Sequence, residues 1–350
     1  MSDLIPPKNA QSTGPFVAAL RPDNFTAAQR TPWGGRRIVE ELKAGLGLVQ
    51  AGPVGESWEI SVSELPSVTR EDGTPLPTLL AADPDHWLGP TEAPLGATRL
   101  LVKLLDAAEP LSVQIHPADD DPALGPDEGG KPEAWYVLHA EDGAGIFLGL
   151  RVGVTERDVT RCLDEGGDVS ALLRFVEVEP GDFFAIDPGT PHAVGAGLTL
   201  LEPQRVIPGR RGVTYRYWDW NRRYDAEGRP APDGVLRPLH RERALAVTDW
   251  GRDWERWLGR ARRRLGVPQR DVPATLEPIV EGTLGASRWT GTGSASLPPG
   301  GRLRGITVVQ GELELDGVHL RQGESAVVAA AAPALPARLR RAHALISWIP

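Results

Sequence analysis

The segment Val113-Gln114-Ile115-His116-Pro117 carries two polar side chains inside an apolar stretch of the chain. In a β-strand, successive side chains point to opposite faces, so Gln114 and His116 share one face and their apolar neighbours share the other. Two polar side chains on one face, two residues apart, do not suit a purely apolar core. The segment therefore predicts a strand in a barrel whose interior binds something.

Two further candidate ligands follow. Glu133 opens a strand-like run at residues 133–138 and shares a face with Trp135, and burying its carboxylate unpaired would cost several kcal/mol. His192 follows a Pro-Gly-Thr-Pro turn, which would let its imidazole face a barrel mouth. His116 alone is better interpreted as a satisfied core histidine. With Gln114 the set supplies two imidazoles, a carboxylate and an amide oxygen, which suits Zn²⁺ with a position left for water or substrate.

The composition is that of an ordinary globular protein of 350 residues, 41% of them hydrophobic and 24% charged. A net charge of −9 argues against a nucleic-acid or acidic-membrane surface. The single cysteine, Cys162, excludes an internal disulfide and fits a reducing compartment. We see no signal peptide and no run near the ~18 apolar residues of a spanning helix. A cytoplasmic protein, monomeric or weakly dimeric, is expected.

Frequent glycines and prolines between short apolar runs predict a mainly β chain with many turns. We expect four parts: a flexible tail at residues 1–15, a metal-binding β-barrel domain at 16–240, a helical connector at 241–268 and a smaller β-domain at 269–350. In the last part, strand-like runs occur at residues 304–309, 312–315, 326–329 and 344–348.

Few helices are predicted. Thr155-Glu156-Arg157-Asp158 resembles a capping signal for a helix that ends near residues 166–167, and Asp168 can cap a second short helix through Arg174. Residues 241–265 are the strongest helical candidate, because apolar residues follow a rough stripe. The basic cluster at residues 260–264 would be a solvated face near the end of that helix.

A partial internal sequence repeat supports two related β-domains. Residues 181–192 read as a turn, a strand, a tight Pro-Gly turn and then His192. Residues 323–328 repeat the opening, but the position equivalent to the histidine is Ala334. The second domain is therefore predicted to keep the barrel pattern and to lack the ligand.

Several segments resemble a known family. Residues 113–120 (VQIHPADD), 130–138 (GKPEAWYVL), 187–197 (DPGTPHAVGAG) and 214–222 (TYRYWDWNR) are similar to the signature segments of type I mannose-6-phosphate isomerase. Residues 32–35 (PWGG), 55–61 (GESWEIS) and 237–240 (RPLH) resemble further motifs of that family. The resemblance covers residues 20–245 and is strongest to the shorter bacterial members. The remainder matches only as a degenerate barrel.

The resemblance implies a zinc enzyme on a cupin (jelly-roll) fold, with one zinc per chain. Gln114, His116, Glu133 and His192 carry over as the zinc ligands, and Lys131 and Arg216 as active-site cations. The substrate would be a sugar phosphate, mannose 6-phosphate or fructose 6-phosphate.

The implied reaction moves a proton between C2 and C1 of the sugar through an enediolate, whose charge a divalent metal can stabilise. A base must reach the carbon-bound proton. Members of the family usually carry an aspartate four residues before the motif arginine, where this chain has Gly212. Glu202 is then the best remaining carboxylate for the base, and a zinc-bound water is the alternative.

Two other functions remain open. A metal cupin of another class, such as a dioxygenase, usually prefers a histidine-rich iron site, and the Gln-His-Glu-His set argues against it. A non-catalytic or weakly active sugar-phosphate-binding cupin of the same family is favoured if Gly212 marks lost chemistry. Metal analysis distinguishes the first from the isomerase, and a turnover assay distinguishes the second.

Overall fold

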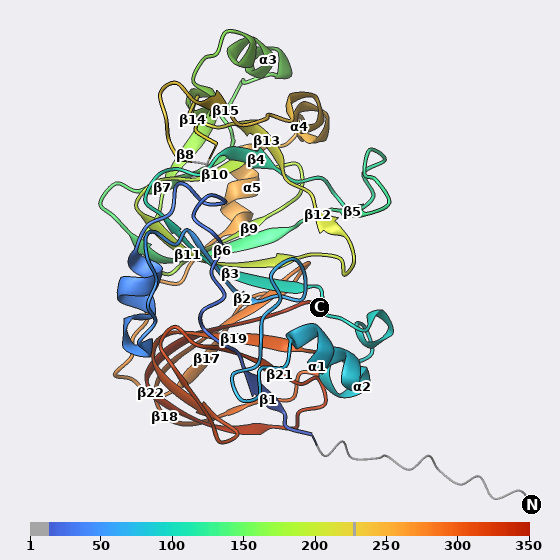
Figure 1. The fold of residues 1–350 in the computed structure, drawn as a ribbon, viewed down its shortest axis with the longest axis vertical. Helices are drawn as coiled ribbons and strands as arrows, with labels where there is room; N and C mark the ends of the chain where they lie inside the picture. Colours follow the sequence, from blue (N-terminus) through green and yellow to red (C-terminus); the bar gives the residue numbers. More distant parts are fainter. Residues whose placement is uncertain (1–13, 227–228) are drawn as a thin grey trace, which may run out of the picture.

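The structure, a computed structural model, describes residues 14–226 and 229–350 and is mainly β, as predicted (Figure 1). Three large sheets carry the architecture. The tail predicted for residues 1–15 lies, as far as residue 13, outside the described residues. In Figure 1 the sheets of residues 56–264 occupy the upper and middle parts, and the C-terminal sheet, in orange and red, lies below them.

Two antiparallel sheets form the first domain. The six-stranded sheet has the order β16 (Arg262–Arg264), β9 (Asp182–Ile186), β6 (Glu133–Ala140), β11 (Leu198–Arg205), β3 (Leu100–Ala107) and β2 (Glu56–Ile60). The five-stranded sheet has the order β13 (Tyr215–Trp218), β4 (Val113–Ile115), β10 (His192–Val194), β7 (Gly145–Leu150) and β8 (Leu173–Glu177). Two short pairs complete it: β12 (Arg211–Gly212) with β5 (Glu128–Gly129), and β14 (Arg223–Tyr224) with β15 (Val235–Leu236).

The two faces of the six-stranded sheet belong to different cores. On β6, Trp135 and Val137 pack into the core that lies between the two sheets of the first domain. Ala134 and Tyr136 alternate with them and pack into a second core, shared with the C-terminal sheet. Because side chains alternate along a strand, Glu133 projects on the same side as Trp135, toward the first core. The pleat of one strand therefore delivers a carboxylate into the domain interior.

The C-terminal sheet has seven strands. Its order is β1 (Val17–Ala19), β21 (Ser325–Val328), β19 (Arg304–Leu315), β22 (Leu335–Trp348), β18 (Gly285–Leu297) and β17 (Thr275–Val280), with β20 (Val318–Arg321) paired to β19. Apolar residues from most of these strands form one common core, so the sheet curls around its own interior. Three of the four strand-like runs predicted for this part of the chain lie in strands, and the fourth, 326–329, lies in β21 except for Ala329.

The two sheet systems are joined through a buried polar contact. Lys43 donates to Glu59 at 2.6 Å (Nζ to Oε1), and Ser325 of β21 donates to the other oxygen of Glu59 at 2.9 Å. Strand β1 pairs with β21, so an N-terminal segment completes the C-terminal sheet. The division of the chain at residues 240 and 268 is kept as a proposal.

The short helices lie at the edges of the sheets. They are α1 (Leu76–Ala82), α2 (Pro84–Trp87), α3 (Glu156–Asp164), α4 (Arg241–Val247) and α5 (Trp254–Ala261), with η1 (Ile38–Leu42), η2 (Ala44–Leu46), η3 (Ala93–Leu95) and η4 (Val169–Leu172). The predicted capping signal is confirmed: the Thr155 side chain accepts from the backbone N–H of Asp158, which returns a carboxylate to the N–H of Thr155. Within the described residues, no helix is long and apolar enough to cross a membrane.

Two helix predictions need correction. Asp168 caps only the single turn η4, and Arg174 lies in β8, which pairs with β7 at the edge of the five-stranded sheet. The long helix predicted at residues 241–265 is two helices and a strand. Asp253 caps α5 by accepting from the N–H of Arg256, so a new helix begins after it.

Of the basic cluster at residues 260–264, only Arg260 lies in the helix, exposed in the last turn of α5. Residues Arg262–Arg264 form β16 and pair with β9, and the Arg262 guanidinium binds the carboxylate of Asp182. A strand partner 80 residues away in sequence thus ends the helix, which local periodicity does not reveal.

Candidate metal centre and active site

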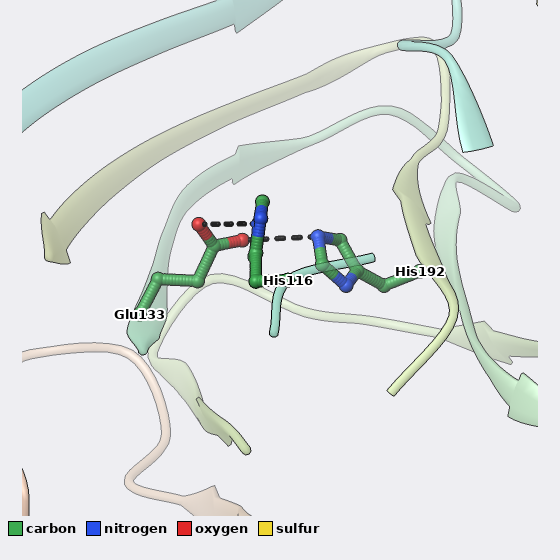
Figure 2. A group of neighbouring side chains, drawn as sticks. All are labelled: His116, Glu133 and His192. Carbon is green, nitrogen blue, oxygen red and sulfur yellow. Dashed lines mark ion pairs between the residues drawn. The ribbon is translucent and has the colours of Figure 1, made fainter. Parts of the chain in front are cut away.

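Three predicted ligands converge in the interior of the first domain. The two carboxylate oxygens of Glu133 each face one imidazole: Oε2 lies 3.1 Å from Nε2 of His116, and Oε1 lies 3.1 Å from Nε2 of His192 (Figure 2). The ligand atoms lie within 4.8 Å of one another. Strand β6 supplies the carboxylate, the residue after β4 supplies one imidazole, and β10 supplies the other. All three side chains are buried.

Hydrogen bonds on the far side of each ring fix the tautomers. Nδ1 of His116 lies 2.9 Å from the carbonyl oxygen of Val213, and Nδ1 of His192 lies 2.8 Å from that of Thr190. A carbonyl only accepts, so each Nδ1 carries the hydrogen. Burial, and next Lys131, lower the pKa of His116 to about 4, which leaves that ring neutral near pH 7. The Nε2 lone pair then faces the carboxylate.

This arrangement fits a metal cation. In neutral rings with Nδ1 protonated, both Nε2 atoms are acceptors, and they face a carboxylate that is also an acceptor, with no hydrogen bond between them. Acceptors held this close need a positive charge among them. Imidazole nitrogen and carboxylate oxygen are ligands that Zn²⁺ takes, and a ligating histidine commonly donates its other N–H to a carbonyl, as both rings do here.

Gln114, the fourth predicted ligand, lies beside this cluster. It is the direct cross-strand partner of His192 between β4 and β10, and it shares a face of its strand with His116. Directly opposed side chains project on the same side of a sheet with their Cβ atoms about 4.5–5.5 Å apart. The register therefore brings the Gln114 side chain next to the His192 imidazole.

Two groups hold the Glu133 carboxylate from the other side. Lys131 lies with Nζ 3.0 Å from Oε2, and Gln204 of β11 donates to the same oxygen at 2.9 Å. Burial alone would raise the pKa of Glu133, but Lys131 and then His116 outweigh it and hold that pKa well below its usual range. Burial likewise opposes the charge of Lys131, whose pKa Glu133 and then Glu202 nevertheless raise. The centre thus contains a fixed carboxylate and a fixed cation.

Glu202, the candidate base, lies on the same side of β11 as Gln204 and is 5% exposed. Its Oε1 accepts from the indole N–H of Trp135 at 3.0 Å, and the Trp135 ring stands edge-on to His192. Burial, and next the charge of Glu133, raise the pKa of Glu202 to about 7. A carboxyl group poised near neutrality can take up or release a proton at physiological pH.

A cavity of about 390 Å³ opens beside the centre. Lys131 and Gln204, which both bind Glu133, line it, and so does Lys103. Further out, its walls carry Arg210, whose guanidinium makes one long contact (3.5 Å) to the carbonyl of Glu128. Cations line the cavity at several depths, the arrangement expected of a site for a small anionic molecule.

Arg216, the other predicted cation, lies on β13 directly across from Gln114 of β4. Its guanidinium donates to the carbonyl of Pro238 at 3.0 Å, and its backbone N–H donates to Nδ1 of His240 at 3.0 Å. The structure thus places Arg216 on the same side of the sheet as Gln114, tied to the segment at residues 237–240. The cation in direct contact with the Glu133 carboxylate is Lys131 instead.

Gly212 lies against the stem of Lys131. A Cβ atom at this position would lie 3.2 Å from Cγ and Cδ of Lys131, which is tighter than ordinary van der Waals contact. Any side chain at position 212 would therefore press on the lysine that holds Glu133. Gly212 is therefore part of the wall of the site.

Sequence reasoning missed three residues of the site: Lys103, Trp135 as a hydrogen-bond donor, and Gln204. Lys103 was detectable, because a lysine in the middle of an apolar run on a central strand is unusual. Its Nζ lies 3.6 Å from Oε2 of Glu56 and 4.5 Å from the centre of the Trp58 ring. Gln204 gave no local signal.

Comparison with solved structures defines the class of fold: a cupin, as predicted. The structure of mannose 6-phosphate isomerase from Bacillus subtilis superposes with a TM-score of 0.72, covering 96% of this chain and 100% of that one at 22% identity. A mannose 6-phosphate isomerase structure bound with zinc and yttrium gives a TM-score of 0.67 over 96% of this chain at 15% identity. At these identities the likeness concerns the fold.

Comparison of sequences supplies the particular resemblance. The chain is 33% identical to mannose-6-phosphate isomerase ManA of Bacillus subtilis over 222 residues, 61% of this chain and 62% of that protein. It is 34% identical to mannose-6-phosphate isomerase of Streptococcus mutans over 224 residues, 63% of this chain and 65% of that protein. The matches thus span less than two thirds of either relative. No protein-family model matches the chain. The predicted resemblance to type I mannose-6-phosphate isomerases is confirmed.

Proposed function

We propose that this chain is a zinc-dependent isomerase that interconverts mannose 6-phosphate and fructose 6-phosphate. One observation carries the proposal: the buried Nε2 atoms of His116 and His192 face the carboxylate of Glu133, beside a cavity lined by cations. The relatives named above supply the reaction and the substrate.

The metal would be held by Gln114, His116, Glu133 and His192, one ion per chain. When bound, it would supply a Lewis acid for the carbonyl and neighbouring hydroxyl oxygens of the sugar. Gln204 and Lys131 orient the Glu133 carboxylate, and the carbonyls of Val213 and Thr190 orient the two rings. Such supporting contacts set the direction of the ligand lone pairs.

The cavity would hold the sugar phosphate with its anionic end among the outer arginines. Arg30 is already paired with Glu64, and Arg211 with Glu128. Within the described part of the chain, the Arg210 guanidinium has only the long contact to a carbonyl, so we assign it to the phosphate. The reacting carbons would then lie toward Lys131, at the inner end.

Proton transfer between C2 and C1 is assigned to Glu202. With a pKa of about 7 raised chiefly by burial, this carboxylate would accept a proton from one carbon and return it to the other. Lys131 would donate to the oxygen on which negative charge develops, and Arg216 would contribute a second cation from β13. Trp135 keeps the Glu202 carboxylate in place through its indole N–H.

A specific observation favours one alternative, a sugar-phosphate-binding cupin with little or no turnover. Gly212 occupies the position of the family aspartate and lies beside Lys131, so one acidic group of the relatives is missing from the wall of this site. In that case the metal and the sugar phosphate would bind while the proton transfer failed.

The test is a turnover assay on metal-replete protein with fructose 6-phosphate, coupled to detection of mannose 6-phosphate, before and after treatment with a chelator. The isomerase predicts turnover that the chelator removes and zinc restores. Binding of fructose 6-phosphate without turnover would establish the alternative. Neither binding nor turnover would refute both.

A further inference from the structure

The C-terminal sheet borders a second, partly open cavity, of about 340 Å³, far from the metal centre in sequence. Residues of β17, β18, β19 and β22 line it, together with the loop between β18 and β19. Figure 1 shows these strands in its lower part. Arg304 begins β19 and alternates with Ile306 and Val308, which belong to the core inside this sheet. Arg304 therefore projects toward that interior, at its end.

Arg304 is a buried cation with spare donors. Its side chain belongs to a residue only 6% exposed, and Nη1 donates to the carbonyl of Pro298 at 2.7 Å. Nε and Nη2 are buried and have no hydrogen-bond partner. Within the part of the chain that the structure describes, no carboxylate forms an ion pair with it. Burial, and next Arg302, lower the pKa of Arg304 to about 10, so the guanidinium still carries its charge near pH 7.

The two unused nitrogens form one edge of the guanidinium. The N–H groups of Nε and Nη2 point in parallel, and this edge matches the two oxygens of a carboxylate or a phosphate. Buried donors are nearly always satisfied, so a free edge of this kind lining a cavity points to a missing partner. Its geometry and its charge together specify an oxyanion.

The residues around the guanidinium complete the wall of the cavity. Gly300 covers the guanidinium, and a Cβ atom there would lie 2.9 Å from Nε, so a larger residue would push the head group aside. Trp348, the cross-strand partner of Arg304, and Ser287 line the same cavity. Glu281, which is exposed, and Pro350 also line it, beside the two arginines Arg302 and Arg304.

We propose that this cavity is a binding site for a small organic oxyanion, a carboxylate or a phosphate monoester, held two-pronged by Arg304. The cavity is of a size that admits such molecules. Trp348 offers an apolar wall to the rest of the ligand, and Arg302 adds a second positive charge. The site is separate from the proposed isomerase centre and does not depend on it.

The proposal is tested by calorimetric titration of the whole protein with inorganic phosphate and, separately, with acetate. Three proteins are compared: the wild type, Arg304→Gln, and the control Arg338→Gln, whose arginine is exposed on β22 of the same sheet. All three keep the metal-centred cavity, so binding there is common to them. The difference between them isolates the C-terminal cavity.

We expect Arg304→Gln to lose the binding of at least one of the two anions, by roughly tenfold or more in affinity, while Arg338→Gln titrates like the wild type. Loss with phosphate alone identifies a phosphate monoester site, and loss with acetate alone a carboxylate site. The proposal is wrong if Arg304→Gln binds both anions with the affinity of the wild type. It is also wrong if the wild type shows no anion binding beyond that of Arg304→Gln.

A second variant covers the case in which Arg304→Gln does not fold. Arg304→Lys keeps the charge and removes the two-pronged edge, so it should bind the anion more weakly than the wild type does. Equal affinity in Arg304→Lys would contradict the two-pronged contact.

Discussion

Replacing Lys131 with methionine tests whether the cation at the metal centre acts on the substrate. The side chain is 12% exposed, and its Nζ lies 3.0 Å from Oε2 of Glu133. A charge-assisted hydrogen bond to a developing oxyanion contributes ~1.5–3 kcal/mol. Since ~1.4 kcal/mol corresponds to a factor of ten in rate, Lys131→Met should lower kcat/KM by roughly ten- to a few hundredfold.

Stability separates this role from a structural one. Without metal, Lys131→Met leaves the Glu133 carboxylate short of a cation, and breaking a buried pair costs ~3–5 kcal/mol. With zinc bound, the ion would neutralise that carboxylate, so the metal-replete variant should unfold close to the wild-type temperature. The assay is the coupled fructose 6-phosphate reaction, with zinc content and thermal unfolding measured on the same samples.

The division between kcat and KM assigns the role of Lys131. A loss in kcat would mean that the lysine stabilises the transition state, and a loss in KM alone would mean uniform binding of the substrate. Lys131→Arg, which keeps the charge, should retain more activity than Lys131→Met. Wild-type kcat/KM in Lys131→Met would refute the reasoning.

Three further outcomes are expected. Arg216→Ala should also lower kcat/KM by roughly ten- to a few hundredfold. Its free energy of unfolding should fall by only about 1 kcal/mol, because the variant loses the bond to the carbonyl of Pro238. Wild-type kinetics in this variant, or a variant that does not fold, would contradict the proposed role. Because the pKa of Glu202 is raised to about 7, the base is protonated below that pH and kcat/KM should fall as pH decreases through 7; in Glu202→Gln kcat should drop by roughly 10²–10⁴-fold, and retention of the same pH profile would exclude Glu202. Lys43→Ala removes the ion-pair partner of the buried Glu59 and should destabilise the fold by ~3–5 kcal/mol in urea unfolding. A loss below about 1 kcal/mol, the value typical of exposed ion pairs, would contradict the burial argument.

Local patterns predicted part of the grouping of these side chains, because the strand pleat alone places Gln114 and His116 on one face. The register of β10 against β4 then brings His192 beside Gln114. The capping box at Thr155 is likewise a contact between near neighbours in sequence, so the sequence reveals it. The use of these four residues as ligands remains a prediction.

Contacts between distant segments were beyond sequence reasoning. Gln204 binds Glu133 across 71 residues, and nothing near residue 204 indicates that partner. The helix predicted at residues 241–265 is interrupted because Asp253 caps a new helix, α5. It ends early because Arg262 pairs with Phe184 of β9. An apolar stripe fixes which face a segment buries, whereas sheet pairing decides where it stops being helical.

The most direct test of the central claim is zinc content and turnover measured together on the wild type and on His116→Ala. His116 has its Nε2 directed at Glu133 and its Nδ1 held by the carbonyl of Val213, so its loss removes one ligand and leaves the neighbouring strands in place. The wild type should contain about one zinc per chain and convert fructose 6-phosphate, and the variant should do neither. Full zinc occupancy with normal turnover in His116→Ala, or normal turnover by chelated wild type, would contradict the account.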